Sequence, residues 1–357
     1  MLKRKVLFIL PNLNSGGAER VAVNYLRQLD FNRYAVTLLV FKKTEDLLHL
    51  IPTNVELIDI TTNSTYKSWW PLLNKIKEIS PDLVYSTHSR VATLLMVIKP
   101  FVNRFYHIAR MQGTPSLDIE YKQYGKFNQF LFSLGFNSAD VVIAQTEEMK
   151  ADGIKNFWIS KENIKVLNNP IDEALINHSI GVCPFPSKGL SAVASGRLTK
   201  AKGFDVLLKS LLGVLKVHPN FRLYILGSEQ EEFQVLNDLV KELGLECNVF
   251  FLGFVENPYP YYAYCDLFIL SSRREGFPNV LLENYYLNTP IIASRCVPIV
   301  EQLIFDNRNG FTCEVNNVDD LSKKIIMGLS LKRTAISNNE YQGSSLNEFF
   351  NSIPFHF

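Results

Sequence analysis

The sequence predicts an α/β protein with two domains, each a doubly wound parallel sheet with helices on both faces. Three observations lead to this expectation. Short apolar runs alternate with segments whose apolar residues recur at helical spacing, which is typical of βαβ units. The alternation occurs in the first half of the chain and again in the second half. With 357 residues, 47% of them hydrophobic, the chain is long enough for two separate cores.

In the first half, apolar runs indicate the strands and helical spacing indicates the helices between them. The expected strands cover residues 6–10, 34–41, 55–60, 81–86, 105–110 and 141–144. The expected helices cover residues 18–29, 69–79 and 91–98. The basic residues before the first strand make it resemble a signal peptide, but its apolar part is short and stops at Pro11. We interpret it as the first parallel strand.

The second half repeats this plan. The expected strands cover residues 191–195, 222–226, 249–252, 267–271 and 290–293, and the expected helices cover 204–217 and 233–243. The stretch with Pro184 and Pro186 has no clear period, and periodicity is lost again from residue 337, which indicates a docking segment or a frayed tail. We therefore expect a first domain over 1–172, a linker over 173–190, a second domain over 191–335 and a tail over 336–357.

Charge and cysteine usage exclude several classes of protein. A net charge of +2 gives no global electrostatic reason to bind nucleic acid. The five cysteines show neither CxxC spacing nor histidine partners at metal-binding spacing, so we expect buried thiols in a reducing compartment. No apolar run approaches the roughly 20 residues that span a bilayer. We expect a cytoplasmic protein, or one at the cytoplasmic face of a membrane.

The nine residues EGFPNVLLE over 275–283 are the most informative stretch of the chain. They follow a short apolar run that indicates a strand, and they lead through a turn into a helical pattern. The turn consists of Gly276, Phe277, Pro278 and Asn279. Parallel strands end where α/β proteins bind ligands, and a helix N-terminus offers free N–H groups to a phosphate or a sugar hydroxyl. Glu275 would lie in the turn, and Glu283 about two helical turns further on. Alternatively, Glu275 is an acid favoured at a helix N-terminus and Glu283 lies on a solvated helix face.

Two glycine-containing loops are candidates to bind a diphosphate. Arg197 and Lys202 follow the strand over 191–195, and two cations beside a helix N-terminus suit a diphosphate. The alternative is a solvated loop, but we favour the phosphate role because the two glutamates are expected at an adjacent strand end. Gly16 and Gly17 would let the loop after the first strand lie over the diphosphate from the other domain. A plain turn is the alternative there, and we assign Glu19 to the first turn of the following helix rather than to chemistry.

Five segments, in order along the chain, resemble the motifs of the retaining glycosyltransferases of family 4. The longest is DLFILSSRREGFPNVLLENYYLNTPIIAS over 266–294. The others are SGGAERV over 15–21, NNPID over 168–172, GRLTKAKGFDVLL over 196–208 and LGFVENPYPYYAYCDLF over 252–268. The match runs from about residue 6 to about residue 315, and the ordered set is far more specific than any single member.

The resemblance implies the GT-B fold, in which two Rossmann-like domains face each other across a cleft. It also implies that Glu275 contacts the donor sugar, that Glu283 contacts the donor ribose, and that the turn between them helps to bind the donor. The expected reaction transfers a hexose or N-acetylhexosamine, with retention, from a nucleotide-diphosphate donor that we expect to be UDP-linked. The acceptor would be a hydroxyl of a glycan or lipid-linked molecule in the assembly of a polysaccharide such as lipopolysaccharide or capsule. We expect no cofactor and no divalent metal, because Arg197 and Lys202 supply positive charge and no Asp-x-Asp motif lies near a strand end.

Two other functions stay open. A nucleotide-dependent oxidoreductase of doubly wound fold requires G-x-G-x-x-G after the first strand, which residues 14–19 do not supply. A non-catalytic protein that binds a sugar or nucleotide would need the same two domains. The presence of Glu275, Glu283, Arg197 and Lys202 together argues against it.

The first domain lacks a histidine that many relatives carry in the segment matching 110–115. Arg110 and Gln112 are candidates to line that wall, and His88, just past a strand end, is a candidate to face the ligand. His107 lies within an apolar strand and is expected to be structural. A front-face departure, in which the leaving diphosphate takes the acceptor proton, needs no protein base, unlike double displacement through a carboxylate nucleophile. We therefore expect His88→Ala and His107→Ala each to keep a substantial fraction of activity.

The first domain is also a candidate to touch an anionic membrane surface. Between His88 and Asn137, six basic residues accompany two acids, with nine Phe and Tyr interleaved. The basic residues are Arg90, Lys99, Arg104, Arg110, Lys122 and Lys126, and the acids are Asp118 and Glu120. Basic residues with large apolar neighbours suit peripheral binding to anionic lipid. The alternative is that the aromatic residues are core and the charges a solvated face.

Overall fold

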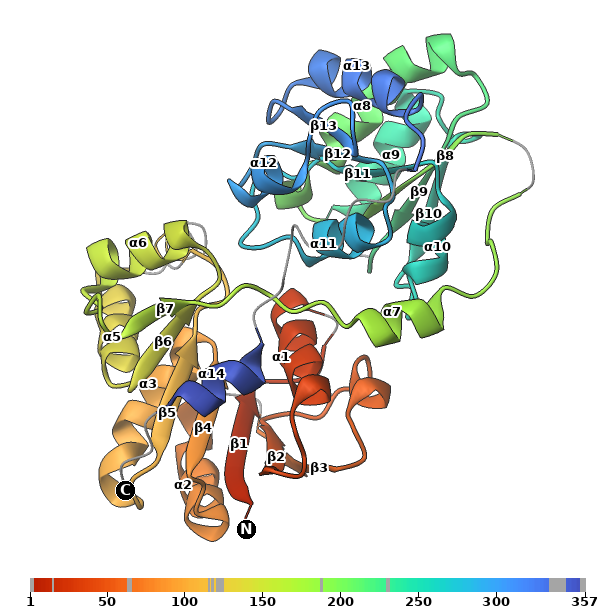
Figure 1. Ribbon diagram of the computed structural model, residues 1–357. Helices are drawn as coiled ribbons and strands as arrows, with labels where there is room; N and C mark the ends of the chain where they lie inside the picture. Colours follow the sequence, from red (N-terminus) through yellow and green to blue (C-terminus); the bar gives the residue numbers. More distant parts are fainter. Residues whose placement is uncertain are drawn as a thin grey trace. The chain divides into compact units, whose positions relative to one another are not determined.

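A computed structural model describes residues 3–14, 16–62, 66–114, 116, 119, 125–186, 189–228, 232–333 and 345–353 of the protein. The chain divides into two compact units (Figure 1). The first unit comprises Met1–Asp172 together with Gly343–Phe357, and the second unit is Glu173–Gln342. The division falls directly after Asp172, the last residue of the expected first domain.

The first unit contains a seven-stranded parallel sheet in the order β3-β2-β1-β4-β5-β6-β7. The strands are β1 (Arg4–Leu10), β2 (Tyr34–Val40), β3 (Val55–Asp59), β4 (Leu83–Thr87), β5 (Tyr106–Arg110), β6 (Val141–Ala144) and β7 (Ile164–Val166). The chain begins in the middle of the sheet and builds outward first on one side and then on the other. The topological switch point therefore lies between β1 and β4.

Helices cover this sheet. The α-helices are α1 (Gly17–Gln28), α2 (Trp69–Ile79), α3 (Ser89–Ile98), α5 (Lys126–Asn137), α6 (Glu147–Phe157) and α14 (Leu346–Ser352), and the short 3₁₀ turns are η1 (Leu48–Leu50), η2 (Tyr66–Ser68) and η3 (Lys99–Phe101). Buried residues of α2 and α3, such as Leu73 and Val91, share one core with Leu7 of β1 and Val84 of β4. A second core joins α5 and α6 to β5 and β6.

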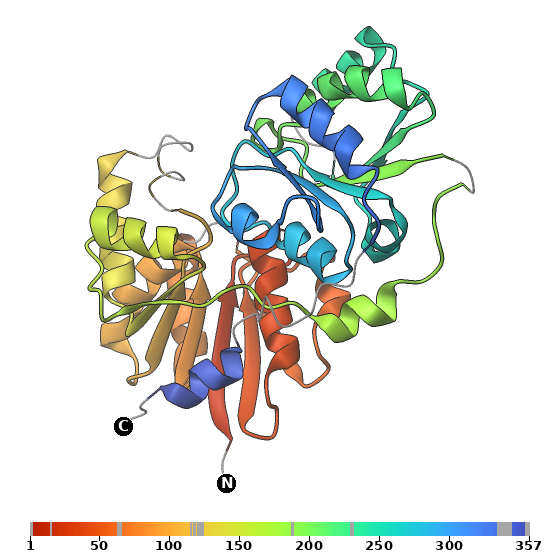
Figure 2. The same cartoon turned by 45° about the horizontal axis from the view of Figure 1, so that its top comes forward.

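The second unit contains a six-stranded parallel sheet in the order β10-β9-β8-β11-β12-β13 (Figure 2). The strands are β8 (Ser191–Ser195), β9 (Arg222–Leu226), β10 (Val249–Gly253), β11 (Leu267–Leu270), β12 (Ile291–Ser294) and β13 (Gly310–Cys313). The helices are α7 (Glu173–Ser179), η4 (Lys200–Lys202), α8 (Phe204–Val217), α9 (Phe233–Glu242), α10 (Tyr259–Tyr264), α11 (Asn279–Tyr286), α12 (Ile299–Leu303) and α13 (Val318–Gly328). Its switch point lies between β8 and β11.

Every strand and helix expected from the sequence is present, with ends within two residues. Helix α7 lies within the stretch 173–190 that we expected as a linker, and helix α14 lies within the expected tail. Both helices have seven residues, which is too short to display a helical period. Helix α6 was also missed, although Thr146 caps it by accepting from the Met149 amide.

Helix α14 packs on the first unit. Leu346, Phe350 and Ile353 are buried and recur at helical spacing, so they form one apolar stripe. The Phe350 ring meets the Tyr34 ring edge-on, with centroids 5.7 Å apart. The Tyr34 hydroxyl also donates to Asn351 Oδ1 at 3.1 Å. A segment more than 300 residues away in sequence thus completes the surface around β2.

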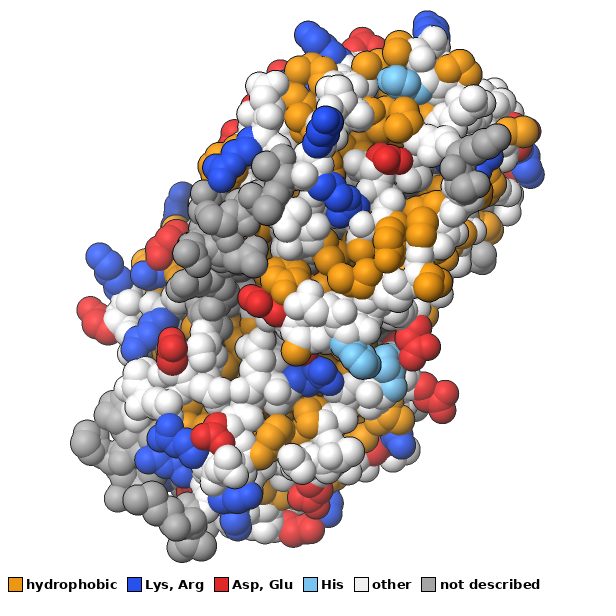
Figure 3. All heavy atoms as spheres, turned by 45° about the vertical axis from the view of Figure 1, so that its right-hand side comes forward, with side chains coloured by type: hydrophobic (Ala, Val, Ile, Leu, Met, Phe, Trp, Pro, Cys, Tyr) orange, Lys and Arg blue, Asp and Glu red, His pale blue; other side chains and the backbone are white. Residues whose placement is uncertain are grey.

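The described surface carries no single-sign charged face in the view of Figure 3, where acidic and basic side chains are interspersed. No helix in the described ranges combines the length and apolar character needed to cross a bilayer. All five cysteines are free, which agrees with the absence of a disulfide framework. Cys265 and Cys313 are buried, but Cys183 and Cys247 are exposed, so the expectation of buried thiols is wrong for these two.

Candidate active site

Two loops at the carboxyl edge of the second sheet bring together residues far apart in sequence. The loop after β8 carries Arg197 and Lys202, and the loop after β11 carries Glu275. Strands β8 and β11 are neighbours on either side of the switch point. In open α/β sheets this is the position at which ligands bind.

Lys202 and Glu275 form an ion pair across this switch point. The Lys202 Nζ lies 2.6 Å from Glu275 Oε1, and the Ser272 hydroxyl donates to the same oxygen at 2.6 Å. The side chains are 21% and 10% exposed, respectively, so the pair is largely shielded but still partly exposed to solvent. Two donors on one carboxylate oxygen fix the orientation of Glu275 and leave Oε2 without a bond to either of them.

Backbone contacts hold the two loops against each other. Gly203 has a φ of +64°, and a Cβ there would collide with the Ser271 carbonyl. The Ser271 hydroxyl donates to the Lys202 carbonyl at 2.9 Å, and the Arg273 amide donates to the Ala201 carbonyl at 2.8 Å. Lys202 is therefore carried on a loop with little freedom to move away from Glu275.

An arginine that the sequence analysis did not select braces the same loops. Arg273 donates to both carboxylate oxygens of Asp205, at 2.7 and 2.8 Å, and to the Lys200 carbonyl at 2.7 Å. These hydrogen bonds lower the pKa of the Asp205 carboxyl. A bidentate pair of this kind is geometrically specific. Asp205 lies in the first turn of α8, where an acidic residue is favoured. Its position in the sequence is the signal from which a partner such as Arg273 could have been sought.

Arg197 does not take part in the ion pair between Lys202 and Glu275. Its side chain is exposed, and no hydrogen bond or ion pair among the described residues involves it. It shares a loop with Lys202 and follows the same strand. Of the three expected catalytic residues, the structure brings Lys202 and Glu275 together and leaves Arg197 at the surface nearby in the chain.

The turn after Glu275 differs in detail from the sequence-based expectation. Helix α11 begins at Asn279, so Glu283 lies about one turn into the helix and not two. Glu283 is 8% exposed, which contradicts the alternative that it lies on a solvated face. Phe277 and Pro278 are buried, while Gly276 and Asn279 are partly exposed. The turn therefore anchors itself with the apolar pair and presents its glycine and asparagine.

Cys296 follows β12 beside this site. Burial raises the pKa of its thiol to about 11, with a smaller contribution from the Glu275 carboxylate. The thiol is therefore protonated near neutral pH and is a poor nucleophile. Within the described residues, no group of three or more His, Cys, Asp or Glu side chains is placed to hold a metal ion.

In the first unit, His88 lies at the carboxyl end of β4 and precedes α3. Gln112 Nε2 lies 2.7 Å from His88 Nδ1, so two expected wall residues are in direct contact. Glu19 also faces His88, with 3.7 Å between Glu19 Oε1 and His88 Nε2. Gly16 caps α1 in an extended conformation, and a Cβ there would collide with the Glu19 carboxylate. Gly17 is the first residue of α1.

Two residues of β5 are buried inside the first unit. Arg110 is 2% exposed, and it donates to the Tyr25 hydroxyl at 3.2 Å and to Asn169 Oδ1. It therefore holds α1 and the end of the first unit together, and the expectation that it lines an open wall is wrong. His107 is fully buried and its ring contacts Ser86 Oγ at 2.8 Å, in agreement with a structural role. Burial lowers the pKa of His107 to about 3.

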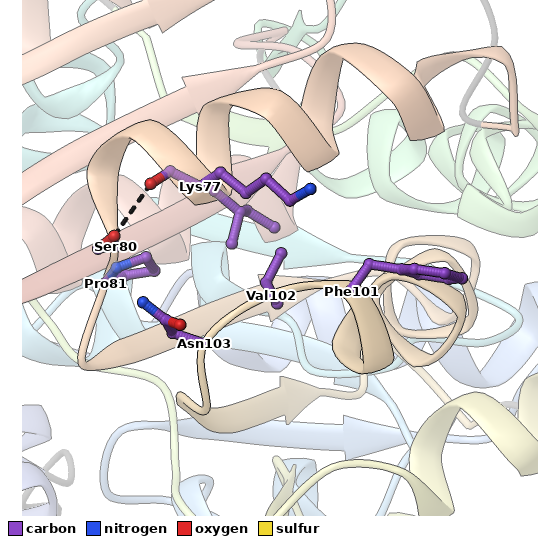
Figure 4. Close-up of a pocket in the computed structure, with 7 residues that line it drawn as sticks. Lys77, Ser80, Pro81, Phe101, Val102 and Asn103 are labelled. Atoms are coloured by element: carbon purple, nitrogen blue, oxygen red, sulfur yellow. Dashed lines mark hydrogen bonds between the residues drawn. The ribbon is translucent and has the colours of Figure 1, made fainter.

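A separate pocket of about 390 Å³ lies in the first unit (Figure 4). It is lined by Ile76, Lys77, Ser80, Pro81, Phe101, Val102 and Asn103. These residues precede β4 and β5, so the pocket belongs to the amino edge of the sheet and not to its carboxyl edge. None of the expected site residues lines it.

Comparison with known proteins identifies the family. The model for Glycosyltransferase Family 4 matches residues 15–175, and the model for Glycosyl transferases group 1 matches residues 181–342. The chain belongs to the family 4 glycosyltransferases. The family expected from the five sequence segments is thereby confirmed.

Individual relatives of this glycosyltransferase cover nearly its whole length. A Campylobacter jejuni protein is 27% identical over 89% of this chain and 88% of its own. It is named N-acetylgalactosamine-N,N'-diacetylbacillosaminyl-diphospho-undecaprenol 4-alpha-N-acetylgalactosaminyltransferase. The O-antigen biosynthesis glycosyltransferase WclY of Escherichia coli is 23% identical over 96% of this chain and 95% of its own.

The solved structures establish the fold. The Anabaena protein HepE, crystallised with UDP and glucose, superposes with a TM-score of 0.75 over 92% of this chain and 90% of its own, at 21% identity. The expected α/β fold of GT-B type is confirmed.

Proposed function

We propose that this glycosyltransferase moves a sugar, with retention, from a UDP-sugar to a hydroxyl of a glycan or lipid-linked acceptor in cell-surface polysaccharide assembly. The contact between Lys202 and Glu275 at the switch point of the second sheet carries the proposal. The names of the C. jejuni and E. coli relatives support a glycan acceptor, and that of the C. jejuni protein supports a lipid-linked one. The UDP bound to HepE supports the choice of nucleotide.

We propose a role for each of the two partners. The Glu275 carboxylate would bond hydroxyls of the donor sugar and position its anomeric carbon, because Ser272 and Lys202 hold one of its oxygens and leave the other available. The Lys202 ammonium has three donors, and one of them is used by Glu275. The others would bond the diphosphate, so one cation would link the sugar-binding carboxylate to the leaving group.

The reaction would proceed on one face of the sugar. The bond between the anomeric carbon and the diphosphate oxygen breaks, and the bond to the acceptor oxygen forms on the same face. The acceptor proton passes to an oxygen of the leaving diphosphate. Lys202, joined by Arg197 once the donor is bound, stabilises the charge that grows on the diphosphate in the transition state. Glu283 would bond the ribose, and Gly16 and Gly17 of the first unit would approach the diphosphate.

Thermal stabilisation by a panel of UDP- and GDP-sugars tests the donor assignment. A ligand bound only by the native state raises the melting temperature by mass action. We expect UDP-sugars to stabilise the protein more than GDP-sugars, and the anomeric configuration of the product to match that of the donor by NMR. An inverted product contradicts the mechanism. NAD(P)H oxidation without nucleotide-sugar turnover would instead indicate an oxidoreductase, and stabilisation without any UDP release would indicate a binding protein.

Metal independence forms part of the proposal, because two basic residues lie on the diphosphate-binding loop. Activity in a chelator should match activity with added Mg²⁺ or Mn²⁺. Complete loss of activity in the chelator, restored by either ion, contradicts this assignment.

A membrane-facing surface on the first unit would bring the enzyme to a lipid-linked acceptor. Phe127 and Phe130 of α5 are 70% and 52% exposed, and Leu134, also exposed, continues the same stripe at helical spacing. Lys126 stands exposed beside the stripe. This surface matches an anionic bilayer, which takes both apolar side chains and basic charge.

The six basic residues expected at this surface do not share one environment. Lys99 pairs with Asp140 at 3.1 Å and Arg110 is buried, so neither is available to lipid. The aromatic residues also divide, because Phe132 and Phe136 belong to the core. Lys122, Asp118 and Glu120 lie outside the described residues.

Flotation with liposomes containing phosphatidylglycerol tests this surface. We expect binding at low salt, weaker binding at high salt, and loss of binding in a Phe127→Ser/Phe130→Ser double variant. Leu212→Ser, which changes an exposed apolar residue of the second unit, serves as the control. Absence of flotation at low salt would remove the membrane from the proposal.

A further inference from the structure

One side chain of the second unit, Arg273, joins three loops at the carboxyl edge of the sheet. Arg273 lies in the loop after β11, two residues before Glu275. Its Nη1 donates to the Lys200 carbonyl and to Asp205 Oδ1, both at 2.7 Å, and its Nη2 donates to Asp205 Oδ2 at 2.8 Å. Its Nε donates to Asn316 Oδ1 at 2.6 Å. Because Lys200 and Asp205 follow β8 and Asn316 follows β13, the loops after β8, β11 and β13 are bonded to one guanidinium.

The partners of Arg273 lie on both sides of Lys202 in the chain. Lys200 is the first residue of η4, which ends at Lys202, and Asp205 lies in the first turn of α8. Arg273 therefore holds the chain two residues before Lys202 and three residues after it. Since Glu275 follows Arg273 by two residues, the same side chain ties the loop that carries the acid to the loop that carries the cation.

These hydrogen bonds depend on the shape of the arginine side chain and not only on its charge. A guanidinium presents donors on three nitrogens in a fixed plane, and Arg273 uses all three nitrogens. A lysine ammonium presents its donors from a single nitrogen, so it cannot reach the same set of acceptors.

Folding stability alone is a poor explanation for this arrangement. The side chains of Arg273 and Asp205 are 29% and 37% exposed. Ion pairs with this degree of exposure contribute little to the free energy of unfolding. The contacts instead act where precision counts, because a small displacement of a charged group beside the reacting atoms has a large effect on rate.

We propose that Arg273 is a positioning residue for sugar transfer, which keeps Lys202 in contact with Glu275 through its bonds to Lys200, Asp205 and Asn316. This inference rests on the proposed function, because it takes the contact between Lys202 and Glu275 as the reaction centre. Arg273 acts through Lys202 and not through contact with the donor.

A double-mutant cycle tests whether Arg273 acts through Lys202. Arg273→Met should lower kcat about tenfold and leave the KM for the acceptor near its wild-type value. In a Lys202→Ala background, the same change should cause no further loss, because the group that it positions is gone. Losses that multiply in the double variant would mean that the two residues act independently, and they overturn the proposal.

Two further variants separate positioning from charge and from folding. Arg273→Lys keeps the charge but loses the planar set of donors, so its kcat should be as low as that of Arg273→Met. Recovery of wild-type kcat in Arg273→Lys overturns the proposal. The matched control is Arg222→Met, which changes a partly exposed arginine at the amino end of β9, on the opposite edge of the same sheet. It should keep the wild-type kcat, and circular dichroism should show that every variant is folded.

Amide hydrogen exchange of residues 200–206, followed by mass spectrometry without donor, distinguishes failure of this inference from failure of the proposed function. We expect exchange in this segment to be about tenfold faster in Arg273→Met than in the wild type or in Arg222→Met. Unchanged exchange overturns the inference, and the proposed function stands if the wild type releases UDP from a UDP-sugar. If the wild type releases no UDP from any UDP-sugar, the proposed function falls, and the exchange measurement still decides whether Arg273 holds the Lys202 loop.

Discussion

Each sheet of this glycosyltransferase has an acidic and a basic side chain facing each other at its switch point, and the two pairs differ in how closely their members approach. In the second unit, Lys202 and Glu275 touch at 2.6 Å, and Ser272 holds the same carboxylate oxygen. In the first unit, Glu19 and His88 stand 3.7 Å apart. The cation follows the first strand in one sheet, whereas the acid follows the first strand in the other.

The difference between these pairs indicates how the second unit meets a ligand. A closed ion pair between full charges is oriented before the ligand arrives, and a ligand must bond to its outer faces. In the first unit, the two side chains stand outside hydrogen-bond range of each other. The closed pair suits a charged donor held in one geometry.

Removing Glu275, the acid of the closed pair, should have the largest effect on activity and is therefore the strongest test of this comparison. We expect Glu275→Ala to lower transfer by about a thousandfold or more, because the donor sugar loses its positioning group and Lys202 loses its partner. The protein should stay folded, which circular dichroism and thermal melting will check. Near wild-type activity in this variant would mean that the closed pair is not the reaction centre.

The cation of the closed pair gives the next largest effect. Lys202→Ala should lower kcat about a hundredfold, since leaving-group charge grows in the transition state, and should weaken UDP-sugar binding less. Lys200→Ala removes an exposed lysine from the same 3₁₀ turn and is the matched control. Equal losses in the two variants would indicate a general electrostatic effect and not a specific contact.

A third variant asks whether the acids of the second unit divide their roles. Glu283→Ala should raise the dissociation constant of UDP about tenfold and leave kcat at saturating donor less affected. Glu242→Ala, on the exposed end of α9, should change neither quantity. Isothermal titration with UDP provides the measurement. A loss confined to kcat would place Glu283 in the chemistry together with Glu275.

The smallest effect on activity is expected at His107, which lies one strand away from His88 but is not part of the pair that Glu19 and His88 form. Its folded pKa of about 3 is below the ordinary value of 6.5, so below pH 6.5 the unfolded chain binds a proton that the native state does not. Stability present above pH 6.5 is therefore lost as the pH falls, by about 2 kcal/mol between pH 7 and pH 5. His107→Gln should reduce this loss in urea unfolding and keep activity at pH 7. An unchanged pH dependence would show that His107 already titrates in the native protein.

The sequence was sufficient to predict that Lys202 and Glu275 lie at adjacent strand ends, because each stands in a motif next to a strand. It did not predict their direct contact. The approach of Glu19 to His88 was not predicted either, because a residue in the first turn of a helix is explained by the helix alone until the tertiary structure shows its neighbour. Arg110 was expected to line a wall of the site because a polar residue at a strand end is normally exposed. Its burial could not be predicted without knowledge of its buried partners. The short helices α7 and α14 carry too few turns to show a period.

The return of α14 to the first unit has a consequence for how the protein is made. The second unit is a continuous insertion in the first unit. The first unit receives the apolar stripe of α14, formed by Leu346, Phe350 and Ile353, only after residue 345 has been made. During synthesis from the N-terminus, the second unit can fold as soon as its own residues have left the ribosome. The first unit, although made earlier, keeps the apolar surface around Tyr34 uncovered until that late segment emerges. The unit translated first is therefore the one completed last.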